Sequence, residues 1–378
     1  MSDRRIVVLD DYFPRLETGF RVAEFTWLLE QDVVAEVMGS IQPFDEIAGP
    51  YRALHPEVAA RVTPYDPSRL GEFDLAYVLF ANNAVAFLPA LAAAKLPFVL
   101  TLYPGGGLDL GAATGTERLD TIYGSGLLRH VITTQPRVTQ YLAEQYGGEV
   151  PVTEVIGVTV NPELFQPGAG LRSGYFGSGK ERLDVCFVAY KYSQGGVDKG
   201  YPQFLDMVRG LRTAGVPLRA HVVGGFARGD LPDGDLTDDL EFHPPLASEA
   251  LRKFYLGMDL IVSPNSPNVL GAGAFDGFPT GAVIEAALSG VAMLCSDELG
   301  QNRLFRDGRS ILIERPDADA MARRLLRLFR EPDGLRRVAR AGLAEARRYY
   351  APAAQLGPRV AALRASLAAL DAEAAAGG

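Results

Sequence analysis

Short hydrophobic runs alternate along the whole chain with longer stretches that have the period of a helix. The runs predict buried strands at residues 5–9, 75–79, 98–102, 131–134, 152–156, 183–189, 219–223, 260–264, 292–296 and 310–313. Strands rich in Val, Ile and Leu and separated by helices are typical of parallel sheets that are covered on both faces. The pattern therefore predicts an α/β fold with two Rossmann-like, doubly wound domains and a C-terminal helix.

A segment without hydrophobic periodicity separates the two series of strands. Residues 161–182 are rich in Gly, Pro and Ser, as linkers are. We expect a first domain at residues 1–167 and a second at residues 168–350. Helical periodicity then resumes, so residues 351–378 are expected to form a terminal helix and tail that cross back to the first domain.

Composition and charge exclude several classes of protein. Of 378 residues, 48% are hydrophobic and 22% are charged, as in ordinary soluble globular proteins. Acidic residues outnumber basic ones by 46 to 37, and the net charge of −9 argues against nucleic-acid binding. Cys186 and Cys295 lie in hydrophobic runs and are expected to be buried thiols. Because no apolar run has the length of a signal peptide or a membrane span, we expect a cytoplasmic location.

The sequence predicts no metal site. Its histidines have no metal-ligand spacing among them; they are His55, His130, His221 and His243. Several aspartates could hold Mg²⁺, but acids in solvated loops explain them equally well. These aspartates are Asp10, Asp11, Asp230, Asp233 and Asp235.

One segment combines the start of a helix with a single charge. Residues 275–290 turn at a Gly and a Pro and enter a helix at Thr280 or Gly281. The free amides of residues 280–283 favour an anion such as a diphosphate, which small side chains allow to approach closely. Glu285 is the one charge in this hydrophobic helix, and a carboxylate there needs partners. Two ribose hydroxyls, each donating to one carboxylate oxygen, would be such partners. The alternative is that Glu285 faces water or stabilises the helix dipole.

Residues 275–290 resemble the signature of retaining, nucleotide-sugar-dependent glycosyltransferases of family 4 (group 1 type). That signature has an acidic residue, Gly-Phe-Gly, an apolar stretch, Glu-Ala and a Gly before the next strand. Further matches follow at residues 155–167 (interdomain passage), 183–200 (strand and Lys-Gly element), 260–265 and, in the first domain, 12–19 (Gly-containing loop). The resemblance implies a GT-B fold, in which two Rossmann-like domains face a cleft.

The resemblance also implies roles for individual residues. Lys199, Lys191 and Asp276 correspond to catalytic positions. The positions that correspond to donor binding are Gly19, Thr280, Gly281, Ala282, Val283 and Glu285. In the implied scheme lysine charge and helix amides stabilise the leaving diphosphate, so neither a metal nor a cofactor besides the nucleoside diphosphate sugar is needed. No general base is assigned, because Tyr103 follows the strand after which the family commonly has a histidine.

Departures from the family pattern leave other functions open. Asp276 stands one position farther from Glu285 than is usual, and Lys191 stands farther from Lys199 than the family's basic residue. The alternatives are a nucleotide-sugar epimerase, a glycosyl phosphorylase, or a catalytically silent nucleotide-sugar-binding protein. The expected partners are a nucleotide sugar and a sugar, lipid-linked or small-molecule acceptor, and not nucleic acid. Arginine-rich helices within residues 303–364 could contact the inner face of a membrane peripherally, although a solvated helix face is the simpler interpretation.

Overall fold

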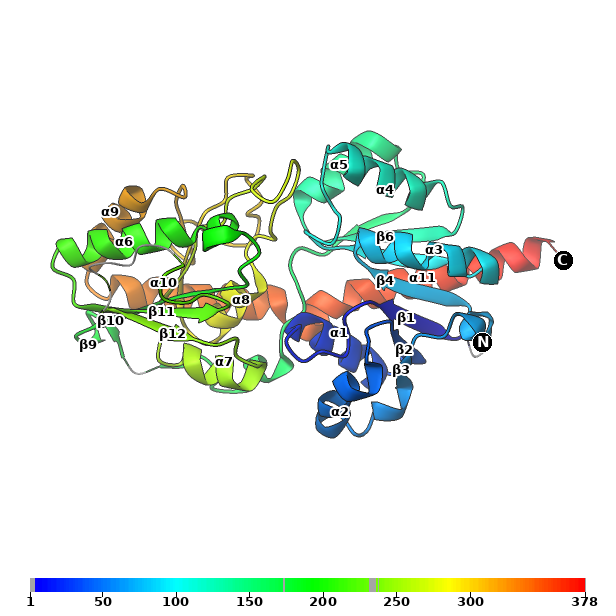
Figure 1. The fold of residues 1–378 in the computed structure, drawn as a ribbon, viewed down its shortest axis with the longest axis horizontal. Coiled ribbons are helices and arrows are strands. Elements are labelled where there is room, and N and C mark those ends of the chain that lie inside the picture. Colours follow the sequence, from blue (N-terminus) through cyan, green and yellow to red (C-terminus); the bar gives the residue numbers. More distant parts are fainter. Residues whose placement is uncertain (1–3, 173, 231–235, 237, 378) are drawn as a thin grey trace. The chain divides into compact units, whose positions relative to one another are not determined.

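The chain folds into two α/β units, each built around its own parallel sheet (Figure 1). The computed structural model describes residues 4–172, 174–230, 236 and 238–377. The first unit is Met1–Thr159, Ala272–Gly277 and Pro352–Gly378, and the second is Val160–Gly271 and Phe278–Ala351. These limits differ from the domains expected from the sequence, because residues 160–167 pack with the second unit and residues 272–277 pack with the first.

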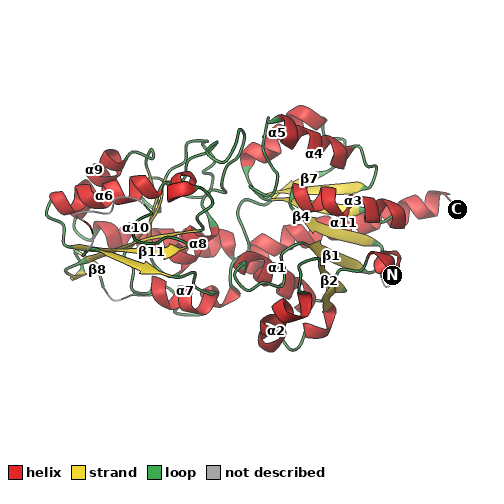
Figure 2. Cartoon of the chain, in the orientation of Figure 1, coloured by secondary structure: helices red, strands yellow, loops and turns green. Residues whose placement is uncertain are grey.

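The sheet of the first unit has the strand order β3-β2-β1-β4-β5-β6-β7, and neighbouring strands are parallel. The strands are β1 (Ile6–Asp10), β2 (Glu36–Gly39), β3 (Val62–Pro64), β4 (Leu75–Leu79), β5 (Phe98–Leu102), β6 (Leu128–Thr133) and β7 (Val152–Glu154). The helices are α1 (Gly19–Glu30), α2 (Phe44–Leu54), α3 (Ala81–Ala94), α4 (Ala113–Tyr123), α5 (Pro136–Tyr146) and α11 (Pro352–Gly377). Helices lie on both faces of this sheet (Figure 2), as in a Rossmann-type fold.

The C-terminal helix α11 packs on the first sheet. Val360 and Leu363 of this helix are buried in the same hydrophobic core as Val8 of β1 and Val99 of β5. Burial of each such side chain stabilises the helix position by about 1.5 to 3 kcal/mol. The helix is therefore part of the first unit although it follows the second unit in sequence.

A buried polar network also holds α11 in place. The guanidinium of Arg359 and the carboxylate of Glu24 are both fully buried, with Arg359 Nε 3.7 Å from Glu24 Oε1. The Tyr103 hydroxyl accepts a hydrogen bond from Arg359 Nη2 at 3.0 Å and donates one to Glu24 Oε2 at 2.9 Å. Tyr77 and Thr159 donate further hydrogen bonds to the Glu24 carboxylate. Because a buried charge is costly without partners, this network fixes α11 against α1 and the sheet.

The sheet of the second unit has the strand order β12-β11-β10-β13-β14-β15, again with parallel neighbours. The strands are β10 (Leu183–Ala189), β11 (Leu218–Gly224), β12 (Leu240–His243), β13 (Leu260–Ser263), β14 (Ala292–Cys295) and β15 (Leu312–Ile313), and the short strands β8 (Tyr175–Phe176) and β9 (Gly179–Lys180) pair separately. The helices are α6 (Tyr201–Thr213), α7 (Ser248–Tyr255), α8 (Gly281–Leu288), α9 (Ala318–Phe329) and α10 (Gly334–Tyr350).

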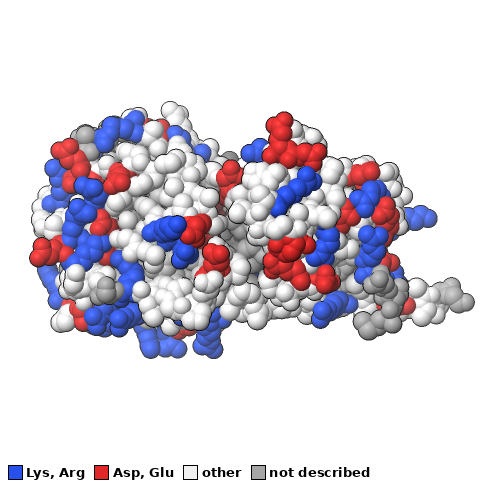
Figure 3. Space-filling model, turned by 90° about the horizontal axis from the view of Figure 1, so that it is seen from below, with Lys and Arg blue, Asp and Glu red and all other residues white. Residues whose placement is uncertain are grey.

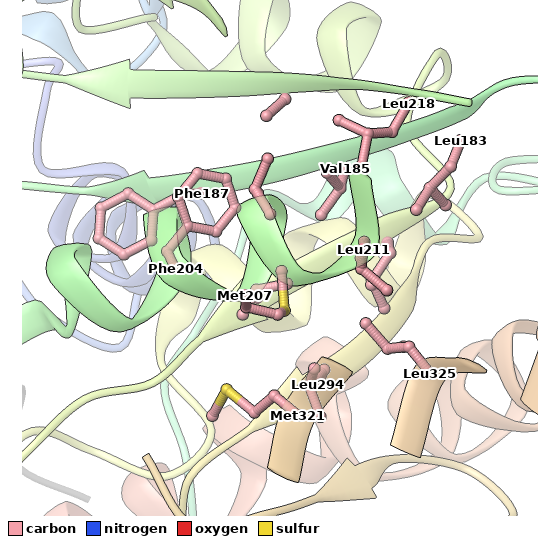
Figure 4. Packing of buried hydrophobic residues seen from close by; sticks show 14 of the residues in the cluster. Leu183, Val185, Phe187, Phe204, Met207, Leu211, Leu218, Leu294, Met321 and Leu325 are labelled. Atoms are coloured by element: carbon pink, nitrogen blue, oxygen red, sulfur yellow. The ribbon is translucent and has the colours of Figure 1, made fainter. Parts of the chain in front are cut away.

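A hydrophobic core fills the space between this sheet and helices α6 and α9 (Figure 4). The side chains labelled there are Leu183, Val185, Phe187, Phe204, Met207, Leu211, Leu218, Leu294, Met321 and Leu325. Alternate residues of β10 point into this core, as the period of two along a strand requires. On α9, Leu325 and Leu328 are buried, and Leu326 and Phe329 are partly buried against the same cluster. The apolar face of the arginine-rich helix α9 thus packs against the core of the second unit.

The predicted fold class is confirmed, since both sheets are parallel, have the Rossmann strand order and are followed by a C-terminal helix. The strands at 75–79, 98–102 and 183–189 have the predicted limits. The hydrophobic pattern does not predict β2, β3 or β12. These strands lie at or next to a sheet edge and include polar residues such as Glu36 and Glu241, so they do not form continuous apolar runs.

The surface carries charges of both signs. In the face drawn in Figure 3, Lys and Arg side chains are interspersed with Asp and Glu. Two arginines of the arginine-rich region pair with nearby acids, Arg324 with Asp307 and Arg337 with Glu331. Among the helices described, none is both long enough and apolar enough to cross a bilayer.

Candidate functional site

The candidate site of the second unit lies at the carboxyl ends of β10 and β13. These strands are neighbours, but the chain continues from β10 to β11 on one side and from β13 to β14 on the other. In doubly wound sheets, ligands bind where the connections diverge in this way. A Cβ added to Gly200 would lie 2.0 Å from the carbonyl oxygen of Pro264, and Ser266 N donates to Asp198 O at 3.1 Å. The loops that follow the two strands are therefore in close contact.

The loop after β10 holds Lys199 in a buried position. Lys199 ends the short 3₁₀ helix η4 (Gln194–Lys199) and is 7% exposed. Its Nζ lies 3.7 Å from Asp198 Oδ2 and 5.0 Å from the centroid of the Tyr192 ring. The backbone N of Ser193 donates to Asp198 Oδ1 at 3.2 Å and so fixes the carboxylate. These contacts hold the lysine charge beside the divergence of β10 and β13.

Lys191 is engaged in an ion pair with Asp230. Its Nζ donates to both carboxylate oxygens at 2.9 Å and lies 5.9 Å from the Phe226 ring centroid. The hydrogen bond from Lys191 is the main reason that the pKa of Asp230 is lowered, and Ala227 N donates to the same carboxylate at 2.8 Å. Asp230 therefore balances the charge of Lys191 and links the loops after β10 and β11. The neighbouring Asp233 and Asp235 lie outside the described residues.

Helix α8 begins without a side-chain cap. Its N-cap residue, Thr280, has an extended backbone, makes no capping hydrogen bond, and is followed by no acidic residue in the first turn. Gly281 and Ala282 are partly exposed, so a ligand can approach the backbone amides at this end. The positive end of the helix dipole and these amides favour an anion.

Glu285 lies one turn into α8 and is half-buried. None of the described residues donates a hydrogen bond to its carboxylate, and burial raises its pKa to about 7. Burial, and after it the charge of Glu285, raises the pKa of the Tyr255 hydroxyl, which itself donates to the carbonyl oxygen of Ala282 at 3.0 Å. The Glu285 carboxyl thus has capacity to accept hydrogen bonds from a ligand.

The structure assigns the predicted site residues to both units. Both loop lysines and the start of α8 belong to the second unit and to the carboxyl edge of its sheet. Asp276 lies in the stretch Ala272–Gly277 of the first unit, in which Gly273 O accepts a hydrogen bond from Leu110 N at 3.2 Å. Gly19 is the first residue of α1, also in the first unit.

Sequence reasoning missed a second polar cluster, at the end of β1 in the first unit. Arg21 Nε donates to Asp10 Oδ2 at 2.9 Å, and Phe13 N donates to Asp10 Oδ1 at 2.7 Å. Asp10 is fully buried, so the interpretation of it as a solvated acid is wrong. Asp11 is about half exposed and accepts hydrogen bonds from Arg21 Nη2 at 3.2 Å and Asn83 Nδ2 at 2.9 Å. The aspartates followed a predicted strand, but nothing in the sequence marked Arg21 as their partner.

Solved structures share this architecture over nearly the whole chain. A glycosyltransferase from Rickettsia africae matches with a TM-score of 0.67 at 11% identity, covering 97% of this chain and 99% of the other. Anabaena Alr3699/HepE in complex with UDP-glucose matches with a TM-score of 0.64 at 15% identity, covering 97% of this chain and 99% of the other. The sucrose-phosphate synthase of Thermosynechococcus elongatus matches with a TM-score of 0.63 at 14% identity, covering 98% of this chain and 100% of the other. The chain has the GT-B fold.

The sequence of the second unit of this GT-B chain also matches a known family. A family model described as "Glycosyl transferase-like" matches residues 203–357, from α6 to the start of α11. This region includes the whole of α8 and therefore Glu285. Residues 203–357 are thus similar to this family. No curated protein sequence matches the chain.

Proposed function

We propose that this GT-B protein is a glycosyltransferase that moves a sugar from a nucleoside diphosphate sugar to an acceptor with retention of the anomeric configuration. The observation that carries the proposal is Glu285, a carboxyl to which no residue of the described part of the chain donates a hydrogen bond, beside the uncapped start of α8. Acidic residues of Rossmann-like folds accept hydrogen bonds from ribose hydroxyls. A ribose diol would give the Glu285 carboxylate the two hydrogen bonds that it lacks.

The diphosphate of the donor would lie between two sources of positive charge. No side chain caps the start of α8, so the backbone amides there can donate to phosphate oxygens, and the helix dipole adds to their effect. Lys199 is held at the neighbouring loop, with little freedom to lose on binding. Lys199 stands directly before Gly200, where the loop contacts Pro264, so we assign it the first place, and Lys191, which Asp230 holds through both carboxylate oxygens, the second.

In the proposed reaction the bond between the anomeric carbon and the diphosphate oxygen breaks. A bond from the anomeric carbon to the acceptor oxygen forms on the same face, and the acceptor proton passes to the leaving phosphate. Lys199 and the α8 amides stabilise the negative charge that grows on the diphosphate, so the scheme needs neither a metal ion nor a further cofactor. It also needs no general base from the protein.

The identity of the donor is proposed from chemistry and likeness together. Anabaena Alr3699/HepE, which shares the fold, has been solved with UDP and with UDP-glucose, so UDP and UDP-glucose are the first probes for this chain. The proposed acceptor is a sugar, lipid-linked or other small molecule. We propose a cytoplasmic protein, with peripheral contact to the inner face of a membrane where the acceptor is lipid-linked.

The test is turnover of UDP, GDP and dTDP sugars by the purified chain. A transferase releases the nucleoside diphosphate, and NMR of the product reports the anomeric configuration. An epimerase would change the sugar without releasing the nucleotide, and a phosphorylase would require inorganic phosphate. Binding of every donor without turnover would identify a silent binding protein and refute the proposal.

Lys199→Ala separates a catalytic lysine from a structural one. Loss of charge stabilisation in the transition state should lower kcat by about 100- to 1,000-fold, with a smaller effect on the affinity for UDP. The matched control is Lys253→Ala, which removes an exposed lysine of α7 and should leave kcat unchanged. Melting curves establish that both variants fold. A Lys199→Ala variant that keeps more than a third of wild-type kcat would remove Lys199 from the scheme.

A further inference from the structure

A second group of chemically active side chains lies on β11 and β12 of the second unit. His221 is on β11, and Glu241 and His243 are on the edge strand β12. The register pairs His221 with Glu241 and Val223 with His243, so these three side chains share one face of the sheet. The face is the one covered by α7, because Phe254 of α7 packs against both imidazole rings.

The three side chains converge to the spacing of metal ligands. His221 Nδ1 lies 3.3 Å from His243 Nε2 and 3.7 Å from Glu241 Oε2, and His243 Nε2 lies 3.6 Å from Glu241 Oε1. Ligand atoms about 2.0 to 2.1 Å from a tetrahedral zinc ion lie about 3.3 Å from one another. The distance between the two imidazole nitrogens equals this spacing, and the distances to the two Glu241 oxygens are a few tenths of an ångström longer. With one ligand atom from each residue, all three lie within 4.8 Å of one another, so side-chain rotation would place them around one ion.

A carboxylate beneath the cluster orients His221 for this role. His221 Nε2 lies 3.1 Å from Asp184 Oδ1 on the adjacent strand β10. Asp184 also pairs with Lys180 Nζ at 2.7 Å and with Arg182 Nη2 at 3.4 Å, so it is ionised and can only accept a hydrogen bond. The proton between them therefore belongs to His221 Nε2, and in the neutral imidazole the lone pair of Nδ1 points to His243 and Glu241. Histidines that bind zinc commonly donate their other ring N–H to a carboxylate in this way.

Solvent can reach the open side of the cluster. The side chains of His221, His243 and Glu241 are 9%, 22% and 44% exposed, so the buried end is anchored and the outer end is accessible. Arg219 Nη1 lies 3.4 Å from Glu241 Oε2, but its side chain is 44% exposed and free to move into solvent. An arriving cation would replace this guanidinium as the partner of Glu241.

We propose that His221, Glu241 and His243 form a binding site for one divalent transition-metal ion, of which Zn²⁺ fits best. Two imidazoles and one carboxylate are a zinc ligand set, and water would complete the tetrahedron. The ion would tie the edge strand β12 to β11, and its role is to stabilise the second unit. The site goes beyond the proposed function and does not depend on it, since none of its residues is assigned a role in donor binding.

The test is Zn²⁺ binding by the full chain after treatment with EDTA. Calorimetry should give one Zn²⁺ per chain, and Zn²⁺ should raise the melting temperature by several degrees. Co²⁺ in place of Zn²⁺ should give the visible absorption of a tetrahedral cobalt complex. Absence of saturable Zn²⁺ binding, or of any thermal shift, would overturn the proposal.

Variants locate the site. His243→Ala should weaken Zn²⁺ binding at least about tenfold and abolish the thermal shift. His55→Ala is the matched control, because His55 lies in another possible ligand group, with Glu30 and Glu57, and its loss should change neither result. Asp184→Asn tests the orienting carboxylate and should weaken Zn²⁺ binding by about 10- to 100-fold. Equal affinities of wild type and His243→Ala, or loss of binding in His55→Ala alone, would refute the assignment.

Discussion

Replacing Glu285 by Gln should stabilise the free protein and weaken its binding of donor at the same time. The pKa of Glu285 is about 7 in the folded chain against 4.5 for an unperturbed glutamate, and the cause is burial. The folded state therefore holds this proton more tightly than the unfolded state does. Unfolding releases a proton between pH 4.5 and 7, so the free energy of unfolding falls as the pH rises through this range.

The size of the effect follows from the same pKa. At about 1.4 kcal/mol for each pKa unit, the ionised carboxyl costs the folded chain up to about 3 kcal/mol above pH 7. Gln keeps the shape and carries no charge, so Glu285→Gln should recover this free energy at pH 8 and gain little at pH 5. With about 2 to 4 °C for each kcal/mol in a domain of this size, the melting temperature at pH 8 should rise by several degrees.

The same substitution removes the charged acceptor for the ribose hydroxyls. A hydrogen bond to a charged group contributes about 1.5 to 3 kcal/mol, so the affinity for UDP should fall by about 10- to 100-fold. The assays are melting curves at pH 5 and pH 8 without ligand, and calorimetry with UDP at pH 8. A melting temperature at pH 8 that does not rise would show that the carboxylate is already well solvated, and unchanged UDP affinity would remove Glu285 from the donor site.

Three further predictions concern the loops, the terminal helix and the charge scheme. Gly200→Ala places a side chain at a left-handed backbone position and against the Pro264 carbonyl, so it should lower the free energy of unfolding by at least about 2 kcal/mol in urea titrations. The control Gly215→Ala is also at positive φ but has open space around it, and should lower the free energy of unfolding by only about 1 kcal/mol. Arg359→Ala leaves the Glu24 carboxylate buried without its cation and should cost about 3 to 5 kcal/mol in the same titration, whereas the exposed Arg364→Ala on the same helix should change it by less than about 0.5 kcal/mol. EDTA should leave sugar transfer at 25 °C unchanged while it lowers the melting temperature; loss of turnover that Mg²⁺ or Mn²⁺ restores would contradict the assignment of charge stabilisation to Lys199 and α8.

The sequence by itself determined the features that depend on neighbours along the chain. Continuous apolar runs predicted the buried strands such as residues 75–79, because a strand covered on both faces has no polar side to alternate with. The small residues before the isolated Glu285 predicted an accessible helix start, since N-terminal amides lack partners in any helix. The edge strand β12 escaped prediction because its alternating Leu-Glu-Phe-His sequence is polar on one side.

Only the tertiary structure decided which charged groups meet. Lys191 pairs with Asp230, and Arg359 pairs with Glu24, although the partners are too far apart in the sequence for any local pattern to predict the pairing. The histidines had no metal-ligand spacing as a linear motif, yet the register of β11 on β12 places His221 beside His243, 22 positions later. Strand register and helix packing bring together residues that are remote in the chain, and hydrogen bonds and ion pairs depend on distances that sequence spacing does not specify.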